Sequence, residues 1–159
     1  MTRWGNTEFD DLKNLSVRLD EYIRTQALME DVARELAKRL LGKVIPRTPV
    51  DTGTLRKGWT AETQEDAENG NVMSVEEYVA TLPIVMYKNY VVIEIVNPVE
   101  YAKYRELGHR TRDHKGWVSG SHFLRISVNE LQREEPRIVQ NILMEQLKEV
   151  FKWFIRVKM

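Results

Sequence analysis

The stretch Pro46-Arg47-Thr48-Pro49-Val50-Asp51-Thr52-Gly53-Thr54-Leu55-Arg56 decides where the first half of the chain changes direction. Its prolines exclude a helix interior, because proline fixes φ and has no backbone N–H to donate. Asp51 and Thr52 favour local bonds from side chain to backbone, and Gly53 is free to adopt a positive φ. We therefore predict a structured turn from Pro46 to Gly53.

Upstream of this turn, the apolar residues recur with the period of a helix. They are Met29, Val32, Ala33, Leu36, Ala37, Leu40, Leu41 and Val44. The stripe predicts a long amphipathic helix that ends between Gly42 and Pro46, where glycine and proline are stop signals. An earlier helix is expected to run from Thr7, a suitable N-cap, to Ile23.

Downstream of the turn, residues 55–63 are expected to form a strand, and the acidic segment Glu65–Asn71 a solvated loop. Ser74 and Glu77 have the spacing of a capping box, which favours a short helix from Val75 to Leu82. An extended conformation of that segment fits nearly as well. Both alternatives remain open from the sequence.

A β-hairpin is predicted for residues 84–96. The runs Ile84–Tyr87 and Tyr90–Val96 are rich in β-branched and aromatic residues, and Lys88-Asn89 separates them. Val91, Ile93 and Ile95 alternate with more polar neighbours, so their face should meet the long helix. Asn97-Pro98 should end the second strand.

The C-terminal third is predicted to be helical around a polar loop. A helical turn over residues 101–107 should stop at Gly108, followed by a basic loop through Gly120. Ser121 suits the cap of a short helix reaching Leu131, and Pro136 suits the first turn of a final helix. The final helix has the apolar stripe Val139, Ile142, Leu143, Leu147, Val150, Phe151 and Phe154.

Taken together, these elements predict a single α+β domain over residues 1–159. We expect an antiparallel sheet of three to four strands, packed against a long N-terminal helix and a C-terminal helix. Met1–Asn6 and Glu65–Asn71 are expected to be flexible.

Composition narrows the classes of function. Lys plus Arg and Asp plus Glu are 24 each, and this balance argues against a dedicated nucleic-acid binder, which normally carries a basic excess. The absence of cysteine excludes disulfides and thiolate sites. The start of the chain lacks the apolar core of a signal peptide, and no window reaches the ~20 apolar residues of a membrane span. We expect a soluble protein that is made in the cytoplasm.

One segment departs locally from this neutral balance. Between residues 103 and 115 the bases outnumber the acids Glu106 and Asp113. The bases are Lys103, Arg105, Arg110, Arg112 and Lys115. Such a patch is typical either of a solvated surface loop or of a contact to phosphate or to an acidic partner.

Two parts of the chain resemble one protein family. Pro49-Val50-Asp51-Thr52-Gly53-Thr54-Leu55-Arg56 resembles the P-V-D-T-G-x-L-R signature of the phage tail-component, or tail completion, family. Residues 97–108 resemble its N-P-x-x-Y-A-x-Y-x-E-x-G element. The triplets at 108–110 and 116–118 are similar to the variant in phages and defective prophages of Gram-positive bacteria, and Phe123-Leu124 matches a later segment. Arg105 and Ser119 depart from the usual pattern.

The resemblance implies a ring-shaped homo-oligomer, a hexamer, that completes the tail or joins it to the head. Its partners would be further copies of itself and neighbouring neck or tail-tube proteins. DNA would pass through the lumen without specific binding, and no membrane, cofactor or enzymatic activity is implied. The protein would be assembled in the bacterial cytoplasm and reside in the virion.

The same resemblance suggests which residues shape the subunit or its contacts. They are Asp51, Thr52, Gly53, Leu55, Asn97, Pro98, Tyr101, Ala102, Tyr104, Glu106, Gly108, His109, Arg110, Trp117 and Phe123. The apolar cluster Phe151, Trp153, Phe154 and Ile155 is a further candidate for contacts.

Two other functions remain as alternatives. A DNA-contacting module would use the basic loop Lys103–Lys115. A metal-dependent hydrolase, such as a nuclease, would use the carboxylates Glu94, Glu100 and Glu106, but these do not form an obvious cluster in the sequence. Separately, His109, His114 and His122 lack the short, fixed spacing of zinc motifs. No catalytic or metal-binding residue is therefore assigned.

Overall fold

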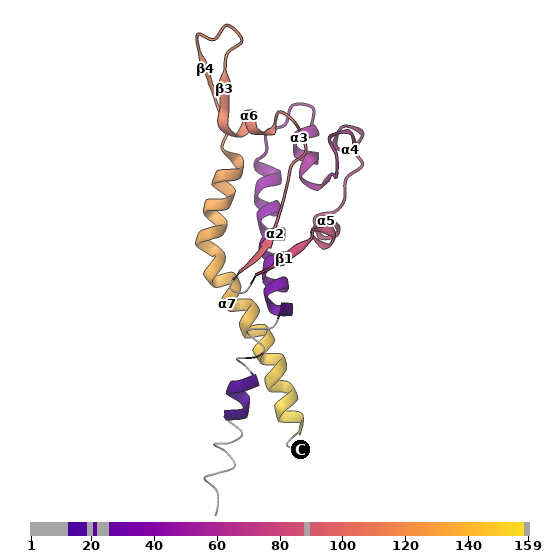
Figure 1. The fold of residues 1–159 in the computed structure, drawn as a ribbon, viewed down its shortest axis with the longest axis vertical. Coiled ribbons are helices and arrows are strands. Elements are labelled where there is room, and N and C mark those ends of the chain that lie inside the picture. Colours follow the sequence, from indigo (N-terminus) through magenta and orange to yellow (C-terminus); the bar gives the residue numbers. More distant parts are fainter. Residues whose placement is uncertain (1–12, 19–20, 22–25, 88–89, 158–159) are drawn as a thin grey trace, which may run out of the picture.

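The computed structural model describes residues 13–18, 21, 26–87 and 90–157, without the side chains of residue 26 and residues 149–157. Two long helices, α2 (Gln26–Arg47) and α7 (Phe123–Val157), lie side by side in opposite directions along the long axis of the molecule (Figure 1). The helix expected between Thr7 and Ile23 falls mainly outside the described residues, although residues 13–18 are helical.

Helix α2 buries the stripe that its sequence pattern predicts. Ala33, Ala37, Leu41 and Val44 are at most 5% exposed. The helix runs through both expected stop signals, Gly42 and Pro46, and ends at Arg47. A proline at the last turn leaves one carbonyl unpaired, that of Gly42, and Gly42 is exposed, so water can satisfy it.

The expected strand at residues 55–63 is wrong, because this segment forms helix α3 (Thr54–Lys57) and the 3-10 helix η1 (Gly58–Thr60). Leu55 and Trp59 are four residues apart, so a helical turn places both on one face, and both are buried. A strand would also place them on one face, so their spacing alone does not decide between the two. Burial of this pair against α2 favours the helix.

The segment expected as a loop at residues 65–71 is also helical. Helix α4 (Gln64–Asn69) begins at Thr63, whose side chain accepts a bond from the Asp66 N–H, and it ends at Gly70 with φ +80°. Ala67 on this helix is fully buried. The short helix α5 (Val75–Thr81) is confirmed, with the predicted capping box between Ser74 and Glu77. These caps hold the Glu77 carboxylate in hydrogen bonds that lower its pKa.

The hairpin predicted for residues 84–96 is confirmed. Strands β1 (Ile84–Met86) and β2 (Val91–Ile93) are antiparallel, with Val85 opposite Val92. The face carrying Ile93 and Ile95 packs on the core and β2 lies against α2. Residues 94–99 continue in an extended form but belong to no strand ladder among the described residues.

A second hairpin occupies the region expected to be a polar loop. Helix α6 (Ala102–Leu107) stops at Gly108 as predicted, and strands β3 (Gly108–Arg110) and β4 (Trp117–Ser119) follow. They pair antiparallel, with Arg110 opposite Trp117, and project from one end of the molecule (Figure 1). The four described strands therefore form two separate hairpins and not one sheet.

Helix α7 replaces the two helices expected around Pro136. Pro136 lies inside the helix, where it removes one backbone bond to the carbonyl of Gln132. Both residues are exposed, so water replaces that bond at little cost. The α+β class is confirmed, with two small sheets flanking long helices. Within the described part of the chain, no helix is both long and apolar enough to cross a membrane.

Candidate functional site

The turn after α2 is built by Thr48, which is fully buried. Its hydroxyl donates to the carbonyl of Val44 at 2.7 Å and accepts from the indole N–H of Trp59 at 2.8 Å. The Thr48 N–H also donates to Val44, at 2.9 Å. One threonine thus ends α2 and fixes the position of Trp59 beneath it.

Arg56 makes a second set of hydrogen bonds at the C-terminal end of α2. Its Nη2 donates to the carbonyls of Pro46 and Thr48 at 3.1 and 3.0 Å. These carbonyls have no helical partner, and a cation beside them also opposes the negative end of the helix dipole. Gly53 enters α3 with φ +86°, in the left-handed region that the sequence pattern assigned to it. The turn is therefore a helix cap shaped by Thr48, Gly53 and Arg56.

Asn97 joins this cap to the second motif. Its Nδ2 donates to the carbonyl of Leu55 at 2.8 Å, and its Oδ1 accepts from the Val99 N–H at 3.2 Å. Gly58 lies directly behind it, because a Cβ there would sit 2.4 Å from Asn97 Oδ1. The two segments that resemble the family signature meet here across 42 residues of sequence.

The side chain of Glu106 lies at the N-terminus of the last helix, α7. Its two carboxylate oxygens accept from the backbone N–H groups of Leu124 and Arg125 at 2.9 and 3.0 Å. The Glu106 carbonyl accepts from the His122 N–H at 3.1 Å. An anion that receives two N–H bonds at a helix N-terminus is stabilised both by those bonds and by the helix dipole. Glu106 is therefore the N-terminal cap of α7, supplied from α6.

The base of the β3–β4 hairpin depends on two glycines. Gly108 has φ +89°, and a Cβ there would meet the Val118 carbonyl at 2.4 Å. A Cβ at Gly120 would lie 2.1 Å from the Glu106 carbonyl oxygen. Both contacts are with backbone, which cannot move aside easily. The hairpin is thus fixed at the same point as the start of α7.

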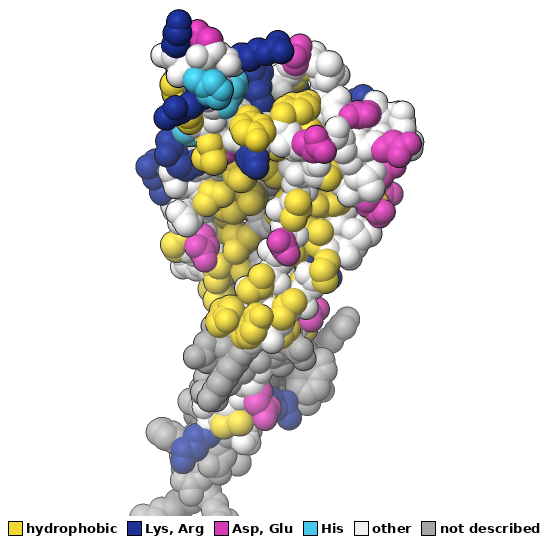
Figure 2. Space-filling view, turned by 45° about the horizontal axis from the view of Figure 1, so that its top comes forward, with side chains coloured by type: hydrophobic (Ala, Val, Ile, Leu, Met, Phe, Trp, Pro, Cys, Tyr) yellow, Lys and Arg dark blue, Asp and Glu magenta, His cyan; other side chains and the backbone are white. Residues whose placement is uncertain are grey.

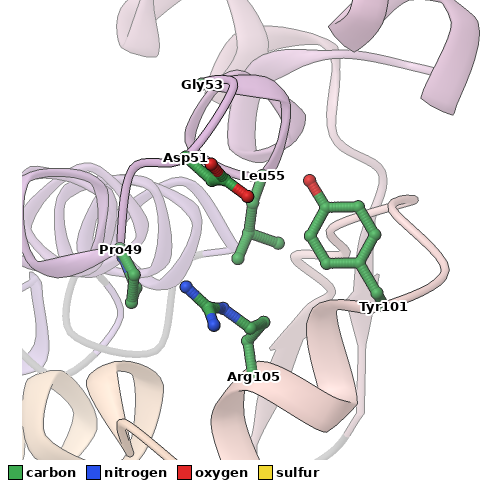
Figure 3. Close-up of a pocket in the computed structure, with 6 residues that line it drawn as sticks. All are labelled: Pro49, Asp51, Gly53, Leu55, Tyr101 and Arg105. Atoms are coloured by element: carbon green, nitrogen blue, oxygen red, sulfur yellow. The ribbon is translucent and has the colours of Figure 1, made fainter.

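We call the region of Thr48, Leu55, Arg56, Asn97 and Glu106 the motif junction. Beside it lies a pocket of about 240 Å³ (Figure 3). The pocket is lined by Pro49, Asp51, Gly53, Leu55, Tyr101 and Arg105. In Figure 3 the Asp51 carboxylate and the Arg105 guanidinium approach the pocket from opposite segments. The pocket is therefore small and has one carboxylate, of Asp51, and one guanidinium, of Arg105, in its lining.

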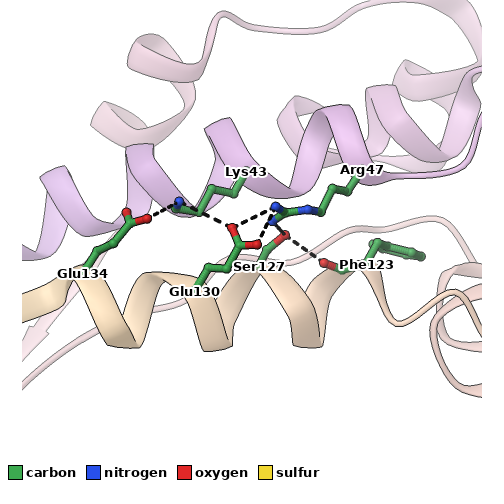
Figure 4. Close-up of polar contacts among 6 residues, drawn as sticks. All are labelled: Lys43, Arg47, Phe123, Ser127, Glu130 and Glu134. Atoms are coloured by element: carbon green, nitrogen blue, oxygen red, sulfur yellow. Dashed lines mark hydrogen bonds and ion pairs between the residues drawn. The ribbon is translucent and has the colours of Figure 1, made fainter.

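Ion pairs and hydrogen bonds connect α2 to α7 next to this junction (Figure 4). Arg47 Nη2 donates to both carboxylate oxygens of Glu130, at 2.7 and 2.8 Å, and Lys43 pairs with Glu134 at 2.8 Å. Arg47 also donates to the buried hydroxyl of Ser127 at 3.2 Å. The Arg47 bond lowers the pKa of the Glu130 carboxyl. These contacts fix the register of the two long helices.

The residues of the hairpin end are exposed, in contrast to the motif junction. The exposed fractions of Tyr104, Leu107 and Trp117 are 49%, 64% and 61%. His109 packs edge-on against Tyr104, with ring centroids 6.3 Å apart. Arg110 lies opposite Trp117 on β4. Large hydrophobic side chains are therefore exposed to solvent around a basic hairpin.

The predicted site residues thus separate into three groups. Leu55, Asn97, Glu106, Gly108 and Phe123 are part of the motif junction or its packing, and Phe123 meets Trp59 edge-on at 6.3 Å between centroids. Tyr104, His109, Arg110 and Trp117 lie at the exposed hairpin end. The remaining predicted residues are Asp51, Gly53 and Tyr101 at the pocket, Thr52 bonded to Thr54, and Pro98 and Ala102, which line a second, larger hollow.

Several residues that build the junction are not predicted from the sequence. Thr48 and Arg56 stand within the quoted motif without an expected role, and Gly58, Gly120 and Ser127 stand outside the predicted set. For Thr48 the available signal is its place just after a long helix, where a hydroxyl can bond back to the last turn. The cluster Phe151 to Ile155 falls on α7 where side chains lie outside the described residues.

Among the described residues, no group of three or more His, Asp or Glu side chains is placed to hold a metal ion. The three histidines are spread over the hairpin and the start of α7, and His114 and His122 have positive φ, at +59° and +51°.

Comparison with known proteins finds one matching family. No curated protein and no solved structure matches the chain. One family model matches residues 12–108, and its description reads "Bacteriophage HK97-gp10, putative tail-component". The match spans more than half of the chain and includes both motifs of the junction. It ends at Gly108, where β3 begins. The chain therefore belongs to the HK97-gp10-like family of bacteriophage tail components.

Proposed function

We propose that the chain is a structural subunit of a ring that completes the phage tail or joins the tail to the head. The family match supports a tail component of the virion, and the ring and its place in the particle are our proposal. One observation carries it. The molecule uses motif residues such as Leu55, Asn97 and Glu106 in the junction and presents exposed apolar side chains at its hairpin end, where another subunit can cover them.

The role of the motif residues supports a structural function in preference to a catalytic one. Thr48, Arg56 and Glu106 are engaged in bonds to backbone groups at helix ends. A side chain that is bound in this way holds the fold and is poorly placed to act on a substrate. The proposed ring needs only fixed surfaces, and no catalytic group.

A ring also needs surfaces that differ from one side of the subunit to the other, because head-to-tail contacts close by rotation. The distribution of charge meets this need. Residues 61–80 contain acids and no Lys or Arg, whereas the hairpin end is basic. Figure 2 shows acidic side chains on the side of α4 and α5, and Lys and Arg side chains toward the hairpin.

The experiment is a mass measurement on the purified full-length chain, by light scattering and native mass spectrometry, with electron microscopy of the same sample. We expect a closed oligomer of a single stoichiometry with a central opening, a hexamer being the specific expectation. A chain that remains monomeric across the accessible concentration range, or that forms open aggregates of mixed size, contradicts the ring.

A second function has one observation in its favour. Lys103, Arg105, Arg110, Arg112 and Lys115 gather on α6 and the hairpin, and such a patch suits DNA phosphates. Binding of duplex DNA is therefore titrated against salt. Tight binding at physiological salt that weakens steeply as salt rises, by a chain that stays monomeric, favours a DNA-contacting module over the ring.

A further inference from the structure

An apolar groove lies beside the motif junction. It has a volume of about 860 Å³ and is bounded by the extended segment 95–100, by α6 and by the start of α7. Its lining is mostly apolar and includes Ile95, Val96, Leu107, Leu124 and Val128. A hollow of this size is in the range of about 300–1,000 Å³ that holds whole ligands, so it can accept several side chains. Figure 2 shows hydrophobic side chains gathered on this face.

The backbone along the groove favours an extended occupant. The extended segment 94–99 continues from β2 and has no strand partner among the described residues, although its own subunit uses the Val96 carbonyl and the Val99 N–H, and Pro98 has no N–H to donate. An open strand edge is a template for pairing with another strand, and natural proteins generally cover it. A β-hairpin offers both a strand edge and side chains to fill the groove.

The β3–β4 hairpin is the matching protrusion. Its strands contact each other and α6, and all three residues of β4 are exposed. An isolated two-stranded hairpin is marginally stable in water, so a covering partner would stabilise this one. Trp117 and Val118 are 61% and 43% exposed. The hairpin leaves α6 at the end of the groove and points away from the body of its own subunit (Figure 1).

Charge sets the orientation of such a contact. The hairpin carries Arg110, Arg112 and Lys115 against one acid, Asp113. One rim of the groove carries Glu100, whose backbone N–H donates to the Gln64 side chain at the start of α4, so the acidic α4 lies directly beyond that rim. Lys103 on α6 and Arg125 at the start of α7 also line the groove. An incoming basic hairpin is therefore attracted toward the acidic α4 and repelled from these two cations.

We propose that the β3–β4 hairpin of one copy docks in the groove of the next copy, with Trp117 in the groove and the hairpin bases facing α4. The contact uses two different surfaces of one chain, so it propagates head to tail. This inference rests on the proposed ring and names the interface that closes it.

The test uses one substitution on each surface. Trp117→Asp alters the hairpin, Val96→Lys alters the groove, and Val85→Lys is the matched control on β1, since Val85 is 48% exposed and does not line the groove. At a concentration at which the wild type is oligomeric, each of the first two variants is expected to associate at least tenfold more weakly. The Val85→Lys variant should assemble as the wild type does. Circular dichroism checks that all three are folded.

Mixing the two interface variants gives the decisive result. Trp117→Asp keeps an intact groove and Val96→Lys keeps an intact hairpin, so a one-to-one mixture should form a heterodimer and stop there. Native mass spectrometry separates this species from either homodimer by mass. A mixture that stays monomeric, or a ring that persists in both variants, overturns the hairpin-in-groove contact. The mass of the wild-type oligomer tests the ring by itself. If the wild type forms a ring and both variants form it too, the ring stands and the hairpin-in-groove contact is wrong.

Discussion

The motif junction and the β3–β4 hairpin lie next to each other but are built in opposite ways. At the junction, Leu55 and Thr48 are at most 3% exposed, and the side chains of Thr48 and Asn97 donate to backbone carbonyls. On the hairpin, all of β4 is exposed and Trp117 is covered by little of its own subunit. The comparison teaches that part of the family's signature, including Leu55, Asn97 and Glu106, holds the subunit together, while other signature residues such as Tyr104 lie on the exposed surface beside it.

The boundary between the two regions coincides with the end of the family match. The matched residues, 12–108, include the junction and stop at the first residue of β3. A junction of caps and buried contacts tolerates few side chains, because each one is fixed by several neighbours. An exposed hairpin has fewer such neighbours within its own subunit, so its sequence is less restrained by the fold.

The largest expected effect comes from Trp59. Trp59→Ala removes a buried indole that packs on Phe123 and donates to Thr48, and we expect a loss of ~3–5 kcal/mol in the free energy of unfolding. Trp117→Ala removes the same type of side chain from the hairpin and should change the free energy of unfolding by no more than ~0.5 kcal/mol. Urea unfolding followed by circular dichroism measures both. Equal losses for the two tryptophans would remove the distinction between the regions.

Glycine substitutions sharpen the comparison at the hairpin base. Gly120→Ala forces a Cβ against the Glu106 carbonyl, and we expect a loss of ~1–3 kcal/mol. Gly42→Ala is the control, because a Cβ there meets nothing within 4 Å and alanine favours the helix, so a gain of ~0.5–1 kcal/mol is expected. The same unfolding assay applies. A neutral Gly120→Ala would mean that the base of the hairpin is not fixed to α6.

Glu106 tests the cap of α7. Glu106→Ala leaves the N–H groups of Leu124 and Arg125 without their acceptor and should cost ~0.5–2 kcal/mol. Glu134→Ala serves as the comparison, because it removes a carboxylate from a surface ion pair worth ~0–1 kcal/mol. Hydrogen exchange should locate the Glu106→Ala effect in the first turn of α7. Faster exchange spread evenly along α7 would contradict a capping role.

The smallest effect is a dependence on pH. Arg47 lowers the folded-state pKa of Glu130, so the folded state binds a proton there less readily than the unfolded state. The stabilisation is present above the ordinary carboxyl pKa and is lost as the pH falls through the lowered value. Glu130→Gln should therefore flatten the acid side of the curve of stability against pH. An unchanged acid limb would show that the ion pair does not contribute.

The local parts of the fold could be predicted from the sequence. The stripe of α2, the capping box at Ser74, the hairpin at residues 84–96 and the stop at Gly108 all follow from neighbouring residues. The segment at 55–63 could not, because its helical state depends on the burial of Leu55 and Trp59 against α2. The helix at 64–69 could not be predicted either, because Ala67 is its one buried residue and its neighbours are acidic or polar.

The site was predictable as a set of segments but not as a set of contacts. The sequence identified the two motifs and the positive φ of Gly53. It could not indicate that Arg56 reaches back to Pro46, or that Glu106 caps a helix 18 residues later, because those bonds join residues that are brought together by packing. The β3–β4 hairpin escapes prediction because its strands are three residues long and its turn is polar.

We infer that the junction holds the subunit together and that the hairpin associates it with its neighbours. Sedimentation equilibrium of Trp117→Ala beside the wild type separates these two roles, at matched concentrations and with unfolding curves recorded for both. We expect superimposable unfolding and an association constant at least tenfold lower for the variant. An association constant equal to that of the wild type, in a variant whose unfolding is unchanged, would overturn this inference.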